Sequence, residues 1–138
     1  MSSLPTSSRR SRRSILSALI ALMLGAAPAY CADKAAAKEQ DRDFQQFYTQ
    51  FQQAVAKSDK QKVASLTKLP YMFDSKNLDR GQFIAKFETL FPSATRKCLS
   101  KAKPIKDQQC YMAFCGEEIF IFARVDGQYK FTEIGVND

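Results

Sequence analysis

Histidine and tryptophan are both absent from this chain of 138 residues. Without histidine the chain cannot form a Ser-His-Asp or Cys-His catalytic arrangement, a histidine metal site or a histidine pH switch. The sequence shows no other nucleophile motif, and its cysteines lack the C-x-x-C spacing of a zinc site. We therefore assign no catalytic, cofactor-binding or metal-ligating residue, and we expect a protein that is not an enzyme.

The chain also has no apolar run long enough to cross a bilayer. Residues 15–24 are apolar, and as a helix they would span about 15 Å, half of a hydrocarbon core of roughly 30 Å. Four arginines precede this run (Arg9, Arg10, Arg12 and Arg13), and Ala27 and Ala29 follow it in an A-x-A arrangement. This order predicts a cleaved signal peptide over residues 1–29, without a transmembrane anchor in the mature form.

Two details of export stay open. Cleavage after Ala29 and cleavage after Cys31 both fit the small-residue pattern. Residues 11–16 (SRRSIL) resemble the twin-arginine signal, but arginines are also common in the n-regions of general secretory signals, so both routes stay open. We expect the mature protein in the bacterial periplasm, with secretion as the alternative.

The net positive charge is small once the signal peptide is removed. The formal net charge of the whole chain is +7, yet the remaining chain has 17 Lys and Arg against 14 Asp and Glu, a net charge of +3. Overall basicity therefore gives no reason to expect binding to nucleic acid.

Export changes the interpretation of the cysteines. Cys98, Cys110 and Cys115 are disulfide candidates, because disulfides are the usual state of cysteine pairs outside the cytoplasm. Cys31 is a fourth candidate if it survives cleavage, and the connectivity is not determined by the sequence. A bond from Cys98 to Cys110 or Cys115 would close the long loop between them.

The N-terminal part of the mature chain predicts a tether followed by helices. Residues 30–41 carry small and charged side chains without an apolar stripe, and we expect a flexible tether there. A single α+β domain is expected over residues 42–138. Its first helix carries apolar residues at spacings of three and four: Phe44, Phe47, Tyr48, Phe51, Ala54 and Val55. Ser58 and Gln61 fit a capping box for a second helix that ends before Pro70.

A third helix is expected from Asp79 to Phe91. Asp79 and Gln82 have the spacing of a capping box, and Pro92 ends the apolar stripe. The following residues, 93–109, predict an irregular segment. It carries Arg96, Lys97, Lys101, Lys103 and Lys106. These five residues are either a contact site for phosphate, a lipid headgroup or an acidic partner, or a solvated loop or edge strand protected by lysine.

The last third of the chain predicts three strands, at residues 111–115, 118–125 and 128–136. Asp126-Gly127 separates the last two, and this dipeptide is typical of a tight hairpin turn. Residues 119–123 are apolar on both faces, so both faces of this strand should be covered. Helices account for one face, and a second copy of the chain in a homodimer is one interpretation of the other.

Helices followed by a hairpin that reads FIFARVDGQYKFTEIGV resemble the nuclear-transport-factor-2-like, or cystatin-like, superfamily. The resemblance implies a curved antiparallel sheet wrapped around the N-terminal helices like a cone. Such proteins include isomerases, dehydratases and non-catalytic binding modules, so the fold alone decides no function. For an isomerase or dehydratase, the polar groups able to point into the cone would be Tyr71, Tyr111, Asp74 and Glu133.

The favoured hypothesis is a non-catalytic exported module that binds a protein or a small apolar ligand in its aromatic interior. One alternative is a secreted inhibitor or immunity-type protein that uses the basic segment against an acidic surface. The other is a small-molecule isomerase or dehydratase of the superfamily type.

Overall fold

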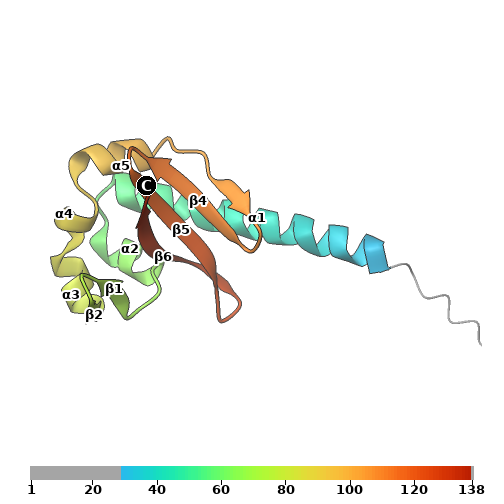
Figure 1. The fold of residues 1–138 in the computed structure, drawn as a ribbon, viewed down its shortest axis with the longest axis horizontal. Coiled ribbons are helices and arrows are strands. Elements are labelled where there is room, and N and C mark those ends of the chain that lie inside the picture. The colour runs from blue at the N-terminus through green and yellow to red at the C-terminus, as the bar shows by residue number, and fades with distance from the viewer. Residues whose placement is uncertain (1–28, 138) are drawn as a thin grey trace, which may run out of the picture.

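A computed structural model describes the backbone of residues 29–137 and the side chains of residues 36–137 (Figure 1). The predicted signal peptide, residues 1–29, lies outside the described residues except for its last residue. The helices are α1 (Ala29–Ala56), α2 (Lys60–Ser65), α3 (Arg80–Ala85), α4 (Phe87–Leu90) and α5 (Ser93–Leu99). The strands are β1 (Tyr71–Phe73), β2 (Lys76–Leu78), β3 (Ile105–Asp107), β4 (Cys110–Cys115), β5 (Glu118–Val125) and β6 (Gln128–Val136). The α+β class predicted from the sequence is confirmed.

The main sheet has four antiparallel strands in the order β3-β4-β5-β6, and β1 pairs with β2 in a separate hairpin. The sheet crosses in front of the second half of α1, and the other helices gather at one end of that helix (Figure 1). Phe44, Phe51, Phe122 and Phe131 have no exposed surface and join α1 to β5 and β6. The core therefore lies between the helices and one face of the sheet.

Each of the four hairpin turns in the described chain has at least one residue in the left-handed region. Asp126 and Gly127 have φ values of 50° and 79°, as a two-residue turn between twisted strands requires. Asp74 and Ser75 have φ values of 49° and 58°, and they join β1 to β2. The predicted hairpin at Asp126-Gly127 is confirmed.

The segment predicted as a flexible tether, residues 30–41, is helical and continuous with the rest of α1. Its alanines, lysines and glutamate favour helix even without an apolar stripe, because their intrinsic helix propensity is high. The described side chains of residues 36–40 are exposed. Packing therefore begins with the second half of α1, as the stripe from Phe44 predicted.

Helix α2 starts and ends differently from the prediction. Ser58 adopts a φ of 54° as α1 ends, so the N-cap is Asp59, whose carboxylate accepts a hydrogen bond of 3.0 Å from the Lys62 amide. The helix stops at Ser65, well before Pro70. Residues 66–68 leave it to pair with β6, where Leu66 and Lys68 each form a backbone hydrogen bond of 2.8 Å with Phe131.

The predicted helix from Asp79 to Phe91 is two helices, α3 and α4, separated at Lys86. Its capping box is confirmed, since the Asp79 side chain accepts from the Gln82 amide and the Gln82 side chain accepts from the Asp79 amide, both at 2.9 Å. The prediction of an irregular segment over residues 93–109 is wrong. The segment contains α5 and β3. The buried side of α5 is formed by Thr95 and Leu99 rather than by a broad apolar stripe.

Candidate functional site

The interior predicted to hold an apolar ligand is filled by aromatic rings. Nine of the 11 phenylalanines are buried. Ring centroids lie 5.1 Å apart for Phe51 and Phe122, and 5.6 Å apart for Phe91 and Phe131. The ring of Phe44 stacks on Tyr111 with centroids 3.5 Å apart. The aromatic stripe of the sequence is thus the packed core of the domain.

The opposite, outer face of the sheet is apolar as well. Side chains alternate between the two faces along each strand, and cross-strand partners share a face. With Tyr111, Ala113, Phe120 and Phe122 facing the core, the intervening residues face outward. The strand register brings together Ile105, Met112, Phe114, Ile119, Ile121 and Ala123 on this outer face.

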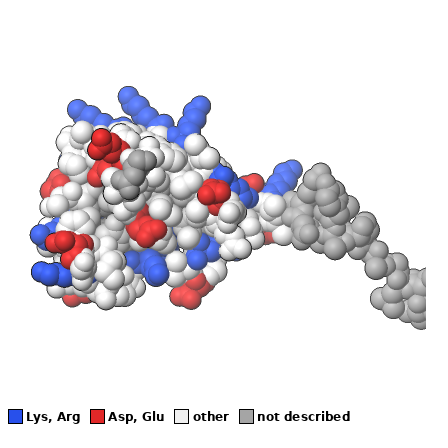
Figure 2. All heavy atoms as spheres, viewed as in Figure 1, with Lys and Arg blue, Asp and Glu red and all other residues white. Residues whose placement is uncertain are grey.

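The outer face is only partly shielded by its own strands. Ile105 is 56% exposed and Phe114 is 39% exposed, and both belong to the same apolar surface. The view of this side shows a largely uncharged surface over β4 and β5 (Figure 2). No helix of the described part of the chain is placed over these strands in Figure 1. We call this surface the outer face, and it is the main candidate binding surface.

Sequence reasoning found only part of the outer face. The apolar run at residues 119–123 predicted that both faces of β5 need a cover, and its alternate residues Ile119, Ile121 and Ala123 line the middle of the surface. Ile105, Met112 and Phe114 were missed. The uninterrupted apolar pattern of residues 110–115 carried that signal for β4, whereas β3 is too short to show any alternation.

The basic residues of positions 96–106 do not act as one group. Arg96 forms an ion pair with Glu88 at 2.6 Å, and Lys106 forms one with Asp41 at 2.6 Å. Within the described residues Lys97, Lys101 and Lys103 have no ion pair, and all three are exposed. Lys and Arg side chains project from the edge of the molecule where α5 and the segment leading to β3 lie (Figure 2).

The segment that carries these lysines is firmly attached to the domain. Cys98 and Cys115 form a disulfide with a Cα–Cα distance of 5.8 Å, which selects one of the two predicted pairings. Cys110 is half-buried and has no disulfide partner among the described side chains. The Ala102 carbonyl accepts hydrogen bonds from the Tyr48 hydroxyl at 2.9 Å and from the Gln52 amide at 3.1 Å. The lysines therefore extend from a fixed backbone.

Asp41 connects α1 to the edge of the sheet. Its carboxylate accepts hydrogen bonds from Lys106 and from the Tyr111 hydroxyl. These hydrogen bonds hold the pKa of Asp41 below its ordinary value, while desolvation and the adjacent carboxylate raise the pKa of Tyr111. Asp41 was not identified from the sequence, because nothing near it signals a contact with residues 106–111.

The four polar groups considered for an isomerase do not form one site. Tyr71 is buried, and desolvation raises its pKa to about 12. The Tyr111 hydroxyl donates a hydrogen bond to Asp41 near the start of β4. Asp74 is exposed on a turn, and Glu133 is exposed on β6. Among the described residues, no three His, Cys, Asp or Glu side chains are grouped to hold a metal ion.

No helix of the described region combines the length and the apolar character needed to cross a membrane. Comparisons with protein-family models, with curated proteins and with solved structures found no match to the chain. The outer face and the lysines beside it therefore stand as candidate sites on their own geometry.

Proposed function

We propose that this protein is a non-catalytic binding module, and that it binds a second copy of itself through the outer face. The observation that supports this is the apolar surface across β3, β4 and β5. Exposed apolar patches rimmed by polar residues are typical of protein–protein contact sites. Burial of the patch would favour association, since apolar area removed from water stabilises a complex by roughly 25 cal/mol per Å².

Two opposite charges at the borders of the outer face favour a second copy as the partner, beside a third charge, the exposed Glu133 that pairs with Ile121 in the register of β6. Asp107 lies on β3, and in the same cross-strand row Lys130 lies on β6 at the opposite border. A two-fold axis parallel to the strands, between two stacked sheets, would place β3 of one copy over β6 of the other. Each Asp107 would then approach a Lys130 of its partner, which is the self-complementarity that a two-fold contact needs.

The test compares exposed apolar residues on and off the outer face. In the double variant Ile105→Glu/Phe114→Glu, carboxylates replace two apolar side chains of the face. The matched control is Met72→Glu/Val136→Glu, because these residues are also exposed, at 61% and 69%, but lie elsewhere. Sedimentation should give a dimer mass for the wild type and the control, and a monomer mass for the face variant.

Two results would contradict the self-association proposal. One is a wild-type monomer at high micromolar concentration. The other is a face variant that keeps the dimer mass. Circular dichroism of both double variants separates loss of association from loss of folding.

Export is proposed with this function. It is supported by the signal-like N-terminal residues and by the Cys98–Cys115 disulfide, a bond that persists mainly in oxidising compartments. Cell fractionation followed by N-terminal sequencing should find the protein outside the cytoplasm, starting at residue 30 or 32. A cytoplasmic chain that retains residues 1–29 would contradict the proposal.

The second candidate function is binding of an acidic protein surface by the basic segment, as an inhibitor would do. It is favoured by Lys101 and Lys103, which are exposed and have no ion pair within the described residues. The charge reversals Lys101→Glu and Lys103→Glu should abolish capture of such a partner from the extract of the source cell. The matched reversals Lys62→Glu and Lys68→Glu should retain it. Equal capture by both pairs would argue against this function.

A further inference from the structure

A hollow of about 230 Å³ lies between the end of α1 and α5, separate from the outer face. It is lined by Ala56, Ser58, Ser93, Arg96, Lys97 and Ser100. The lining thus offers two cations and three hydroxyl groups, and no carboxylate. Hydrogen-bond donors and positive charge without acceptor-only groups form the environment that an oxyanion requires.

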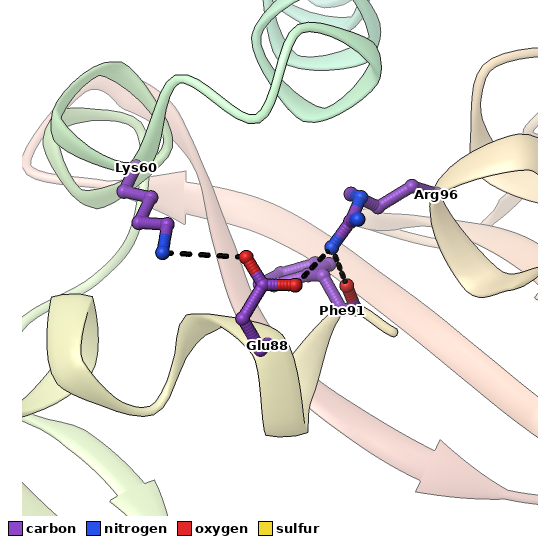
Figure 3. Close-up of polar contacts among 4 residues, drawn as sticks. All are labelled: Lys60, Glu88, Phe91 and Arg96. Atoms are coloured by element: carbon purple, nitrogen blue, oxygen red, sulfur yellow. Dashed lines mark hydrogen bonds and ion pairs between the residues drawn. The ribbon is translucent and has the colours of Figure 1, made fainter. Parts of the chain in front are cut away.

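Arg96 is held in place from one side of its guanidinium. Its Nη1 donates to Glu88 at 2.6 Å and to the Phe91 carbonyl at 2.7 Å (Figure 3). Glu88 is itself paired with Lys60 at 3.2 Å, so its charge is shared between two cations. Among the described contacts, the other guanidinium N–H groups of Arg96 have no partner. An arginine fixed in this way loses little side-chain entropy when it binds a ligand.

The other groups around the hollow are also available. Lys97 has no ion pair within the described residues, and neither Ser58 nor Ser93 uses its hydroxyl in a hydrogen bond there. Ser100 donates to the Lys97 carbonyl at 2.8 Å, so its oxygen faces a ligand only as an acceptor. The donors for an anion are therefore Arg96, Lys97, Ser58 and Ser93.

Three of the last four carbonyls of α1 are paired, so the end of α1 repels an anion less than an open helix terminus would. Carbonyl groups at a helix C-terminus carry partial negative charge when they are unpaired. Here the carbonyls of Gln53, Ala54 and Val55 accept backbone hydrogen bonds of 2.9 to 3.1 Å from the residues that follow the helix. Their lone pairs are thus directed to the chain itself.

We propose that this hollow binds a phosphate group, which belongs either to a soluble phosphate compound or to a phospholipid headgroup. Its volume is several times the about 30 Å³ that one water molecule occupies in the liquid, so a phosphate with its first waters fits. The site is independent of self-association, because none of its lining residues lies on the outer face.

The first experiment titrates the isotope-labelled full chain with inorganic phosphate at constant ionic strength and follows backbone amide resonances. Shifts should be confined to residues 56–58 and 93–100. Lys97→Gln should weaken binding about tenfold, as expected for loss of one charge-assisted hydrogen bond. Ser93→Ala should weaken it less. The matched control is Lys101→Gln, which removes the same charge from a neighbouring residue that does not line the hollow.

Equal weakening in Lys97→Gln and Lys101→Gln would overturn the site and leave only diffuse attraction to a basic segment. Unchanged binding in both Lys97→Gln and Ser93→Ala would also overturn it. A second arm uses vesicles of phosphatidylglycerol and phosphatidylcholine. Cosedimentation that Lys97→Gln reduces and Lys101→Gln preserves assigns the phosphate to a headgroup. Phosphate binding without such cosedimentation assigns it to a soluble compound.

Discussion

Individual phenylalanines in this protein have opposite roles, although the sequence alone does not separate them. Phe122 is completely buried and contacts the rings of Phe47, Phe51 and Phe131. Phe114 lies on the neighbouring strand and is 39% exposed on the outer face. The difference arises from strand alternation, and it becomes certain only when the register of β4 and β5 is known.

Phe122→Ala should lower the free energy of unfolding by about 3–5 kcal/mol, since a large side chain leaves a cavity in a packed core. Phe114→Ala is the control with the same change in chemistry. It should cost only about 1–2 kcal/mol, because part of its ring already contacts water. Denaturant unfolding at low protein concentration measures both. A larger loss for Phe114→Ala would place its ring in the core.

Glu88 makes stability depend on pH. Hydrogen bonds from Arg96 and Lys60 hold its pKa below the ordinary value of 4.5. A carboxylate with a lowered folded pKa stabilises the protein above its unfolded pKa, and this contribution disappears as the pH falls through the folded pKa. The gap in Tm between the wild type and Glu88→Gln should therefore be present at neutral pH and close below pH 4.5. Glu117→Gln, an exposed carboxylate outside the described ion pairs, should show no such closing gap.

At the scale of elements, the sequence predicts a cap or a turn correctly where the residues that determine it lie within a few positions of one another. The capping box of Asp79 and Gln82 and the turn at Asp126-Gly127 need only local chemistry. The end of α2 and the existence of β3 could not be predicted in this way. Residues 66–68 leave the helix to pair with Phe131, which is distant in the sequence. Strand β3 is defined by its pairing with β4, and the short sequence of β3 does not indicate that partner.

The candidate binding sites were likewise predicted only where the residues involved are close together in the sequence. The basic residues were found from the sequence, but their division into paired and unpaired groups depends on Glu88 and Asp41. The hollow between α1 and α5 was not predicted, because its serines belong to two separate elements and carry no motif.

The disulfide fixes α5 against β4 and should contribute to stability as a covalent link between elements. Cys98 and Cys115 are 17 residues apart, and closing a loop of this length is worth about 3 kcal/mol. The variant Cys98→Ser/Cys115→Ser should lose about that amount in denaturant unfolding. Reducing agent should lower the stability of the wild type but not of the variant. Cys110→Ser, the control at the cysteine outside this disulfide, should keep the full response to reducing agent.

At the scale of the whole molecule, self-association should appear as a dependence of folding on concentration. If two folded copies bind through the outer face, mass action raises the Tm as protein concentration increases. The wild type and Met72→Glu/Val136→Glu should show this rise. The Tm of Ile105→Glu/Phe114→Glu should stay constant over the same range. A constant Tm for the wild type would contradict the dimer.

The pairing of residues 66–68 with Phe131 has a consequence for how copies of this chain can join. Continuous growth of a fibre by strand addition requires an open edge on each side of the sheet. On the β6 side of this sheet, Leu66 and Lys68 already occupy the backbone groups of Phe131. On the β3 side the edge strand is only three residues long and carries Lys106. Polymerisation through the sheet edges is thereby hindered, which directs assembly toward a closed pair.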